Sequence, residues 1–286
     1  MTARLKKELA LLALASLIPL SAAAQTVVPF TLTGDLVTVK ATANGLPLTM
    51  IVDLGAGVDV LSSGAARTLD VIATRRYTNW RMEGERVDGD IGTLPTLSLG
   101  TLQISSAPAI IWSGLDGSGI DGLISASAFR SRPVTFDYAS HLLVLEDEGS
   151  FAKRTRTAAK VPIELADDRD ISLGIFAWFD FGRGQRGLCE IDTGSQGFFL
   201  DNRFASRLGI NLGDARLKHV QGPAGERIIA TIPQVAVAGA PTSAIAAPKA
   251  IFTNLIYDCN VGNEFWRGRA FTLDIANRAL YLGGPS

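Results

Sequence analysis

The sequence predicts an all-β protein made of two β-barrel lobes that are related by duplication and pseudo-two-fold symmetry, with a few short helices. Short β-rich segments separated by turn residues fill most of the 286 residues, and long helical periodicity is missing. A turn of pattern Asp-x-Gly occurs twice, at Asp53 and at Asp192. The segments on either side of the two turns also resemble each other, which indicates one fold used twice.

The repeat continues well beyond the turns. Asp121 and Asp258 sit in matching segments, and Asp137 and Asp274 sit in a second matching pair. The separations are 139 residues for the turns and 137 for both later pairs, so the register drifts by only two residues. Solenoid repeats are about 20–50 residues long. A period this long therefore indicates two lobes, which we place at residues 26–149 and 156–286.

The elements of the first half follow from local patterns. Residues 26–52 are expected to form strands, with Asn44-Gly45 as a hairpin turn. Ser62 or Ser63 can cap a short helix. Residues 77–92 are polar and contain glycines, as a mobile hairpin would.

The second half offers counterparts to these elements. Asp201 can cap a short helix, and residues 219–226 match the polar hairpin. Residues 134–138 and 271–275 are expected to form the strand that closes each lobe. The polar and basic stretch 146–160 is the best candidate for the connection between lobes.

The N-terminus has the pattern of a secretory signal peptide, which we assign to residues 1–24. Arg4, Lys6 and Lys7 precede an apolar stretch from Leu9 to Leu20, and an Ala-x-Ala site ends at Ala24. The stretch is too short for a stable membrane span. We expect a periplasmic or secreted protein; an uncleaved N-terminal anchor is the alternative.

Composition limits the partners and cofactors. A net charge of −1 offers no field for nucleic acid. His141 and His219 are the two histidines of the chain, and no His/Cys cluster has the spacing of a metal site. We therefore expect no metal or other cofactor, no nucleic acid and no stable membrane span.

Cys189 and Cys259 are the two cysteines, both in the second half. In an oxidising compartment they could form a disulfide. Packing as two buried thiols is an equally good interpretation, because the sequence does not show their separation.

Two neighbouring carboxyls have a well-defined chemistry. Like charges repel at short range, so the pair shares one proton; one member then acts as a base and the other as an acid. Such a pair can activate water against an amide. The glycine of each turn lets the backbone approach its partner closely.

The turns resemble the aspartic protease superfamily, in both its pepsin-like and retropepsin-like branches. Asp-Thr-Gly-Ser at 192–195 matches the family signature fully, and Asp-Leu-Gly-Ala at 53–56 keeps the Asp, the Gly and a small fourth residue. The family's hydrophobic-hydrophobic-Gly element appears at 260–262 and, less well, at 123–125. The resemblance covers roughly residues 30–285.

The resemblance implies a cleft between the lobes, a covering hairpin and a catalytic dyad of Asp53 and Asp192. Either hairpin could be the flap, with 77–92 the first choice. It also implies a monomer whose lobes pair within the chain. The residues expected to support the dyad are Gly55, Ala56, Thr193, Gly194 and Ser195.

The sequence is compatible with two functions. The first is an exported aspartic endopeptidase acting on polypeptides. The second is a noncatalytic peptide-binding protein on a degenerate scaffold, because Leu54 replaces a Thr or Ser and Ser125 replaces a Gly of the family pattern.

The signal-peptide pattern predicts export with cleavage after Ala24. N-terminal sequencing of the secreted or periplasmic protein should then begin at Gln25. A cytoplasmic protein that still begins at Met1 would contradict the assignment.

Overall fold

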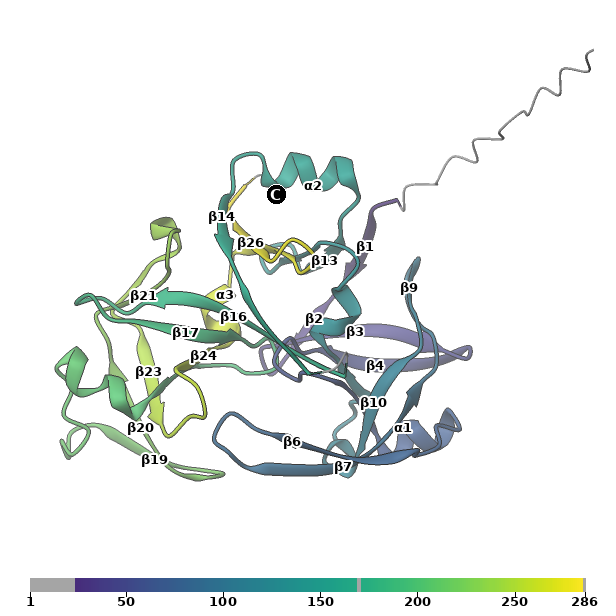
Figure 1. Cartoon of the computed structure of the whole chain (residues 1–286), viewed down its shortest axis with the longest axis horizontal. Coiled ribbons are helices and arrows are strands. Elements are labelled where there is room, and N and C mark those ends of the chain that lie inside the picture. Colours follow the sequence, from purple (N-terminus) through teal and green to yellow (C-terminus); the bar gives the residue numbers. More distant parts are fainter. Residues whose placement is uncertain (1–23, 169–170, 285–286) are drawn as a thin grey trace, which may run out of the picture.

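The computed structural model describes residues 24–168 and 171–284. It is mainly β, with 49% strand and 13% helix, and contains two similar mixed sheets, one of them a half-barrel. Figure 1 shows one mixed sheet on the right and the other on the left, with a third sheet above and between them. The predicted fold class is confirmed. The predicted signal peptide falls almost entirely on residues outside the described ranges.

The first mixed sheet belongs to what we call lobe one. Its strand order is β6-β7-β10-β5-β11-β4-β3-β8-β9, with β2 paired to β3. The strands are β2 (Thr31–Thr33), β3 (Leu36–Ala43), β4 (Leu46–Val52), β5 (Asp59–Ser62), β6 (Arg75–Trp80), β7 (Arg86–Leu94), β8 (Leu97–Leu99), β9 (Leu102–Ile104), β10 (Ala107–Trp112) and β11 (Gly122–Ile124).

The second mixed sheet, in lobe two, repeats that order. It runs β19-β20-β23-β18-β24-β17-β16-β21-β22, with β15 paired to β16. Each strand thus has a counterpart at the same place in the lobe-one sheet. The strands are β15 (Glu164–Asp168), β16 (Ser172–Asp180), β17 (Arg186–Ile191), β18 (Phe198–Asp201), β19 (Lys218–Gly222), β20 (Gly225–Thr231), β21 (Gln234–Val237), β22 (Ile245–Ala246), β23 (Lys249–Thr253) and β24 (Cys259–Val261).

A third sheet joins the lobes, in the order β1-β13-β12-β25-β26-β14. The two expected closing strands pair with each other at its centre: Phe136 lies opposite Phe271, and their rings stack with centroids 4.8 Å apart. Burial of the apolar side chains where β12 pairs with β25 fixes one lobe against the other. The strands are β1 (Thr26–Pro29), β12 (Val134–Asp137), β13 (Leu142–Leu145), β14 (Ala159–Pro162), β25 (Ala270–Asp274) and β26 (Ala279–Leu282).

The helices are short. Ser62 caps α1 (Ser63–Thr68) by accepting a hydrogen bond from the Ala65 amide, as the sequence predicts. Asp201 caps the first of two successive 3₁₀ turns, which stand in place of the one short helix expected there. The remaining helices are α2 (Glu148–Thr155) and α3 (Asn263–Trp266), with 3₁₀ turns η1 (Ser113–Leu115), η2 (Ala126–Phe129), η3 (Asn202–Phe204), η4 (Ser206–Leu208) and η5 (Pro241–Ser243).

The connection between lobes is more ordered than its polarity indicated. Asp147 and Ser150 form a capping box that starts α2. Arg154 on this helix forms an ion pair with the buried Glu146, with 2.6 Å between Nε and Oε1. The helix therefore packs onto the third sheet instead of forming an extended linker.

Cys189 and Cys259 form a disulfide. They lie directly opposite each other on the parallel strands β17 and β24, with Cα atoms 4.4 Å apart. In the described ranges, no helix is long and apolar enough to cross a membrane.

Candidate active site

The two Asp-x-Gly turns occupy equivalent places in the two lobes. One lies between β4 and β5, and the other between β17 and β18. A parallel neighbour strand supports each turn: the Asp53 amide donates to the Ile124 carbonyl at 2.9 Å, and the Asp192 amide donates to the Val261 carbonyl at 3.1 Å. The backbone of each Asp is thus held by its own lobe, independently of the contacts that its side chain makes.

The turns meet tip to tip and bring Asp53 and Asp192 into contact. A Cβ atom placed on Gly55 would lie 2.5 Å from the Asp192 Cγ, and one on Gly194 would lie 2.2 Å from the Asp53 Cγ. Both distances are shorter than any real contact. Glycine is therefore required at both positions, because each carboxyl occupies the space beside the opposite glycine.

The two carboxyls are electrostatically coupled. Burial, and then the negative charge of Asp192 and a hydrogen bond with it, raise the pKa of Asp53 well above its usual range. The Gly55 amide opposes this effect by donating to Asp53 Oδ1 at 3.0 Å. Asp53 therefore keeps a proton at a pH where an ordinary aspartate is ionised.

Thr193 ties the two turns together across the seam. Its hydroxyl donates to the Val52 carbonyl at 2.7 Å and accepts from the Leu54 amide at 3.0 Å. Leu54 provides no such hydroxyl in return, and its side chain is fully buried at the seam. The lobe-two turn therefore contributes hydrogen bonds across the seam through Thr193, and the lobe-one turn contributes apolar packing through Leu54.

A polar network surrounds Asp192, and sequence reasoning missed most of it. Asn260 donates to Asp192 Oδ2 at 2.7 Å, and Ser195 donates to Asn260 Oδ1 at 2.7 Å. Glu190 accepts hydrogen bonds from Tyr257 and, at 3.4 Å, from Asn260. One feature of the sequence could have identified this network. Glu190 and Asn260 are polar residues inside buried strand segments, at positions where the first half has Ile51 and Leu123.

Ser125, where the family pattern has a glycine, is accommodated by a lobe-specific contact. Its amide donates to Asp59 Oδ1 at 2.7 Å, whereas the amide of Gly262 in lobe two donates to the Gly197 carbonyl at 2.9 Å. Burial raises the pKa of Asp59 to about 6 despite this hydrogen bond. The departure at position 125 therefore preserves the backbone hydrogen bonding of the element.

The β6–β7 hairpin reaches across to lobe two and is held there. The Glu83 carboxylate at its tip accepts two hydrogen bonds from Arg227, at 2.7 and 2.6 Å, and one from Thr253 at 2.8 Å. The Ile256 amide also donates to the Met82 carbonyl at 3.0 Å. The Glu83 side chain is only 1% exposed. This hairpin, the preferred flap candidate, is thus docked rather than free.

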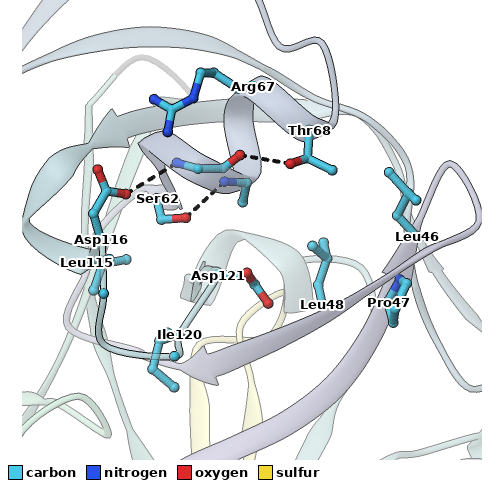
Figure 2. A pocket seen from close by; sticks show the side chains of 14 residues that line it. Leu46, Pro47, Leu48, Ser62, Arg67, Thr68, Leu115, Asp116, Ile120 and Asp121 are labelled. Carbon is cyan, nitrogen blue, oxygen red and sulfur yellow. Dashed lines mark hydrogen bonds between the residues drawn. The ribbon is translucent and has the colours of Figure 1, made fainter.

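A surface hollow lies elsewhere on lobe one. It has a volume of about 740 Å³ and is bordered by β4, α1 and the segment after η1, and neither dyad residue lines it (Figure 2). Asp121 at its floor accepts a hydrogen bond from the Thr49 amide at 2.7 Å. In the described part of the chain no cluster of His, Cys, Asp and Glu could hold a metal ion.

Residues 39–128 match the family model described as aspartyl protease. The match lies within the first half of the chain, which is therefore similar to the aspartyl protease family. The matched stretch contains Asp53 but not Asp192, so the likeness of lobe two rests on the repeated motifs and the similar sheet. No curated protein matches the chain. The catalytic roles of the predicted site residues stay predictions.

Thr193→Val should weaken the fold at the seam between the two turns. The substitution leaves the Leu54 amide and the Val52 carbonyl without their partner, and an unsatisfied buried group costs about 1–3 kcal/mol. Denaturant unfolding measures the loss. Thr193→Ser keeps the hydroxyl and should lose clearly less; equal losses would mean that the cross-seam hydrogen bonds contribute nothing.

The docked hairpin should loosen at acid pH. Burial disfavours the charge of Glu83, but its hydrogen bonds from Arg227 and Thr253 and the nearby charges of Arg227 and Arg81 outweigh this and lower its pKa. The contribution of ionised Glu83 to docking is therefore fully present at pH values above the ordinary glutamate pKa. It is lost as pH falls through the lowered pKa of Glu83.

Hydrogen exchange, corrected for intrinsic rates, measures this docking through the Ile256 amide, which donates to the Met82 carbonyl across the contact. Protection should fall with pH in the wild type and be low at every pH in Glu83→Gln. Glu85→Gln, two residues along the same tip, is the matched control and should behave as wild type. Unchanged protection in Glu83→Gln would show that the ion pair does not hold the hairpin.

Proposed function

We propose that the protein is an exported aspartic endopeptidase, which hydrolyses peptide bonds with a water molecule activated between Asp53 and Asp192. The observation that carries the proposal is the contact of two carboxyls from opposite lobes, one of which has a strongly raised pKa. A pair that holds one proton provides a base and an acid at one place.

The reaction needs no other group. The ionised carboxyl takes a proton from water while the water oxygen bonds to the peptide carbonyl carbon, and the protonated carboxyl gives its proton to the carbonyl oxygen. The resulting diol then collapses: the C–N bond breaks, the nitrogen takes a proton from the first carboxyl, and a diol hydroxyl returns a proton to the second. The dyad ends with one proton, as it began.

A polypeptide is the substrate that this arrangement favours. The reacting groups lie on the seam between lobes, and the β6–β7 hairpin extends from lobe one to Arg227 of lobe two. A segment of extended chain can lie along such a seam once the hairpin opens. Both carboxyls come from one chain, which supports action as a monomer, and the disulfide between Cys189 and Cys259 supports an oxidising, exported setting.

A noncatalytic peptide-binding protein is the second candidate. Leu54 in the dyad turn and the docked position of Glu83 favour it, because one hydroxyl of the seam is absent and the covering hairpin is held closed. Such a protein would retain a peptide or a pepstatin-type inhibitor without hydrolysing any substrate.

Digestion of a peptide library at several pH values tests the proposal. Asp53→Asn and Asp192→Asn should each lower the turnover rate by about 10²–10⁴-fold, the usual contribution of acid–base catalysis. Asp214→Asn, which changes an aspartate bonded locally to Arg216, is the control and should keep wild-type activity.

The pH dependence has a fixed sign. Activity requires the proton on Asp53, whose pKa is raised. Hydrolysis should therefore persist at pH values above the usual aspartate range, and should fall as pH rises through the raised pKa of Asp53. Full activity in either dyad variant, with thermal unfolding showing an intact fold, would place the chemistry elsewhere. An inert wild type that still binds peptide would favour the second candidate.

A further inference from the structure

The polar network around Asp192 has no equivalent around Asp53, although the surrounding strands match. The repeat places an apolar residue at each corresponding position of lobe one. The registers agree, because Glu190 lies beside Asn260 on β17 and β24 as Ile51 lies beside Leu123 on β4 and β11. The network members are Glu190, Ser195, Tyr257 and Asn260, and their lobe-one counterparts are Ile51, Ala56, Ile120 and Leu123.

Asn260 is fixed in one orientation. Its Oδ1 accepts from the Ser195 hydroxyl at 2.7 Å, and carboxyl oxygens of Asp192 and Glu190 surround the other end of the amide, which suits the donating Nδ2. The Nδ2 end therefore faces the dyad and donates to Asp192 Oδ2 at 2.7 Å. Asn260 itself is fully buried, so water does not compete for this hydrogen bond.

Glu190 completes the far side of the network. The Tyr257 hydroxyl donates to its Oε2, which also lies 3.4 Å from Asn260 Nδ2. Burial, and then the charge of Asp192, raise the pKa of Glu190 to about 8 despite these hydrogen bonds. Below that pH it is neutral and adds no second negative charge beside the dyad.

The disulfide holds the strands that carry this network. Cys189 and Cys259 are paired one register position before Glu190 and Asn260 on the same strands. The corresponding pair in lobe one is Met50 and Gly122, which cannot be cross-linked. The network is therefore built on the more rigid of the two strand pairs.

Hydrogen-bond donors are consequently distributed unequally over the dyad. Asp192 accepts at both oxygens, from the Gly194 amide at 2.8 Å and from Asn260 at 2.7 Å. On Asp53, the described residues outside the dyad contribute the Gly55 amide at 3.0 Å. Donors favour the charged form of a carboxyl, so the negative charge of the pair belongs on Asp192.

We propose that Asn260, held by Ser195 and by the Glu190–Tyr257 pair, is a positioning residue that keeps Asp192 as the ionised, water-activating member of the dyad and leaves the shared proton on Asp53. This role assignment rests on the proposed endopeptidase function. The protonation asymmetry itself exists without substrate, and it can be measured separately from hydrolysis.

Carboxyl ¹³C NMR of protein labelled at aspartate tests the proposal at neutral pH, with the resonances assigned from the Asp→Asn variants. In the wild type, Asp53 should show the shift of a protonated carboxyl and Asp192 that of a carboxylate. Asn260→Leu introduces the lobe-one residue type and should move both resonances toward a common intermediate value. Ser195→Ala, a smaller change that releases the Asn260 amide, should move them in the same direction.

Two further variants separate positioning from a general loss of structure. Asn277→Leu also removes an amide that donates to a buried carboxylate, that of Asp274 at 2.8 Å, but at the turn between β25 and β26; it should leave both resonances unchanged. Glu190→Gln keeps a neutral group of the same shape and should resemble the wild type below pH 8.

The pH profile of hydrolysis gives a second readout. Loss of the Asn260 donor favours the protonated form of Asp192, so the active pH range of Asn260→Leu should move upward. The kcat of this variant should fall by a larger factor than its KM changes.

Unchanged ¹³C shifts in both Asn260→Leu and Ser195→Ala would overturn the proposal, as would a wild type with the proton on Asp192. An inert wild type with the expected shifts would instead reject the endopeptidase function and leave the role of Asn260 intact.

Discussion

The close approach of the two Asp-x-Gly turns is the constraint on which the rest of the structure depends. Each carboxyl fills the space where the opposite glycine would carry a side chain. This contact requires the lobes to be fixed against each other, which the paired strands β12 and β25 and the Thr193 hydroxyl provide. The same contact couples the carboxyls and raises the pKa of Asp53, so packing and acid–base chemistry have one cause.

The two turns occupy equivalent places in the two lobes, but their surroundings differ. Lobe two has a threonine at the seam, a polar network behind its aspartate and a disulfide across its strands. Lobe one has Leu54 at the seam and contributes the docked hairpin instead. A dyad works with one base and one acid, so two different environments serve it better than a symmetric pair does.

Much of the fold could be predicted from the sequence because Asp-x-Gly turns, helix caps and the spacing of the repeat are local signals. Ser62 caps α1 as its position indicated. The pairing of Phe136 with Phe271, the ion pair of Glu83 with Arg227 and the contact of Asn260 with Asp192 could not be read, because they join residues 68 to 144 positions apart. In such cases a pattern identifies the residue type, and only the fold identifies its partner.

The location of the dyad proton is the property that separates an unequal pair of carboxyls from an equal one. Neutron diffraction from a deuterium-exchanged crystal at neutral pH shows each carboxyl proton and the orientation of the Asn260 amide. We expect a deuteron on Asp53, none on Asp192 and the Nδ2 end of Asn260 facing Asp192. A deuteron on Asp192, or two carboxyls that do not touch, would contradict this expectation.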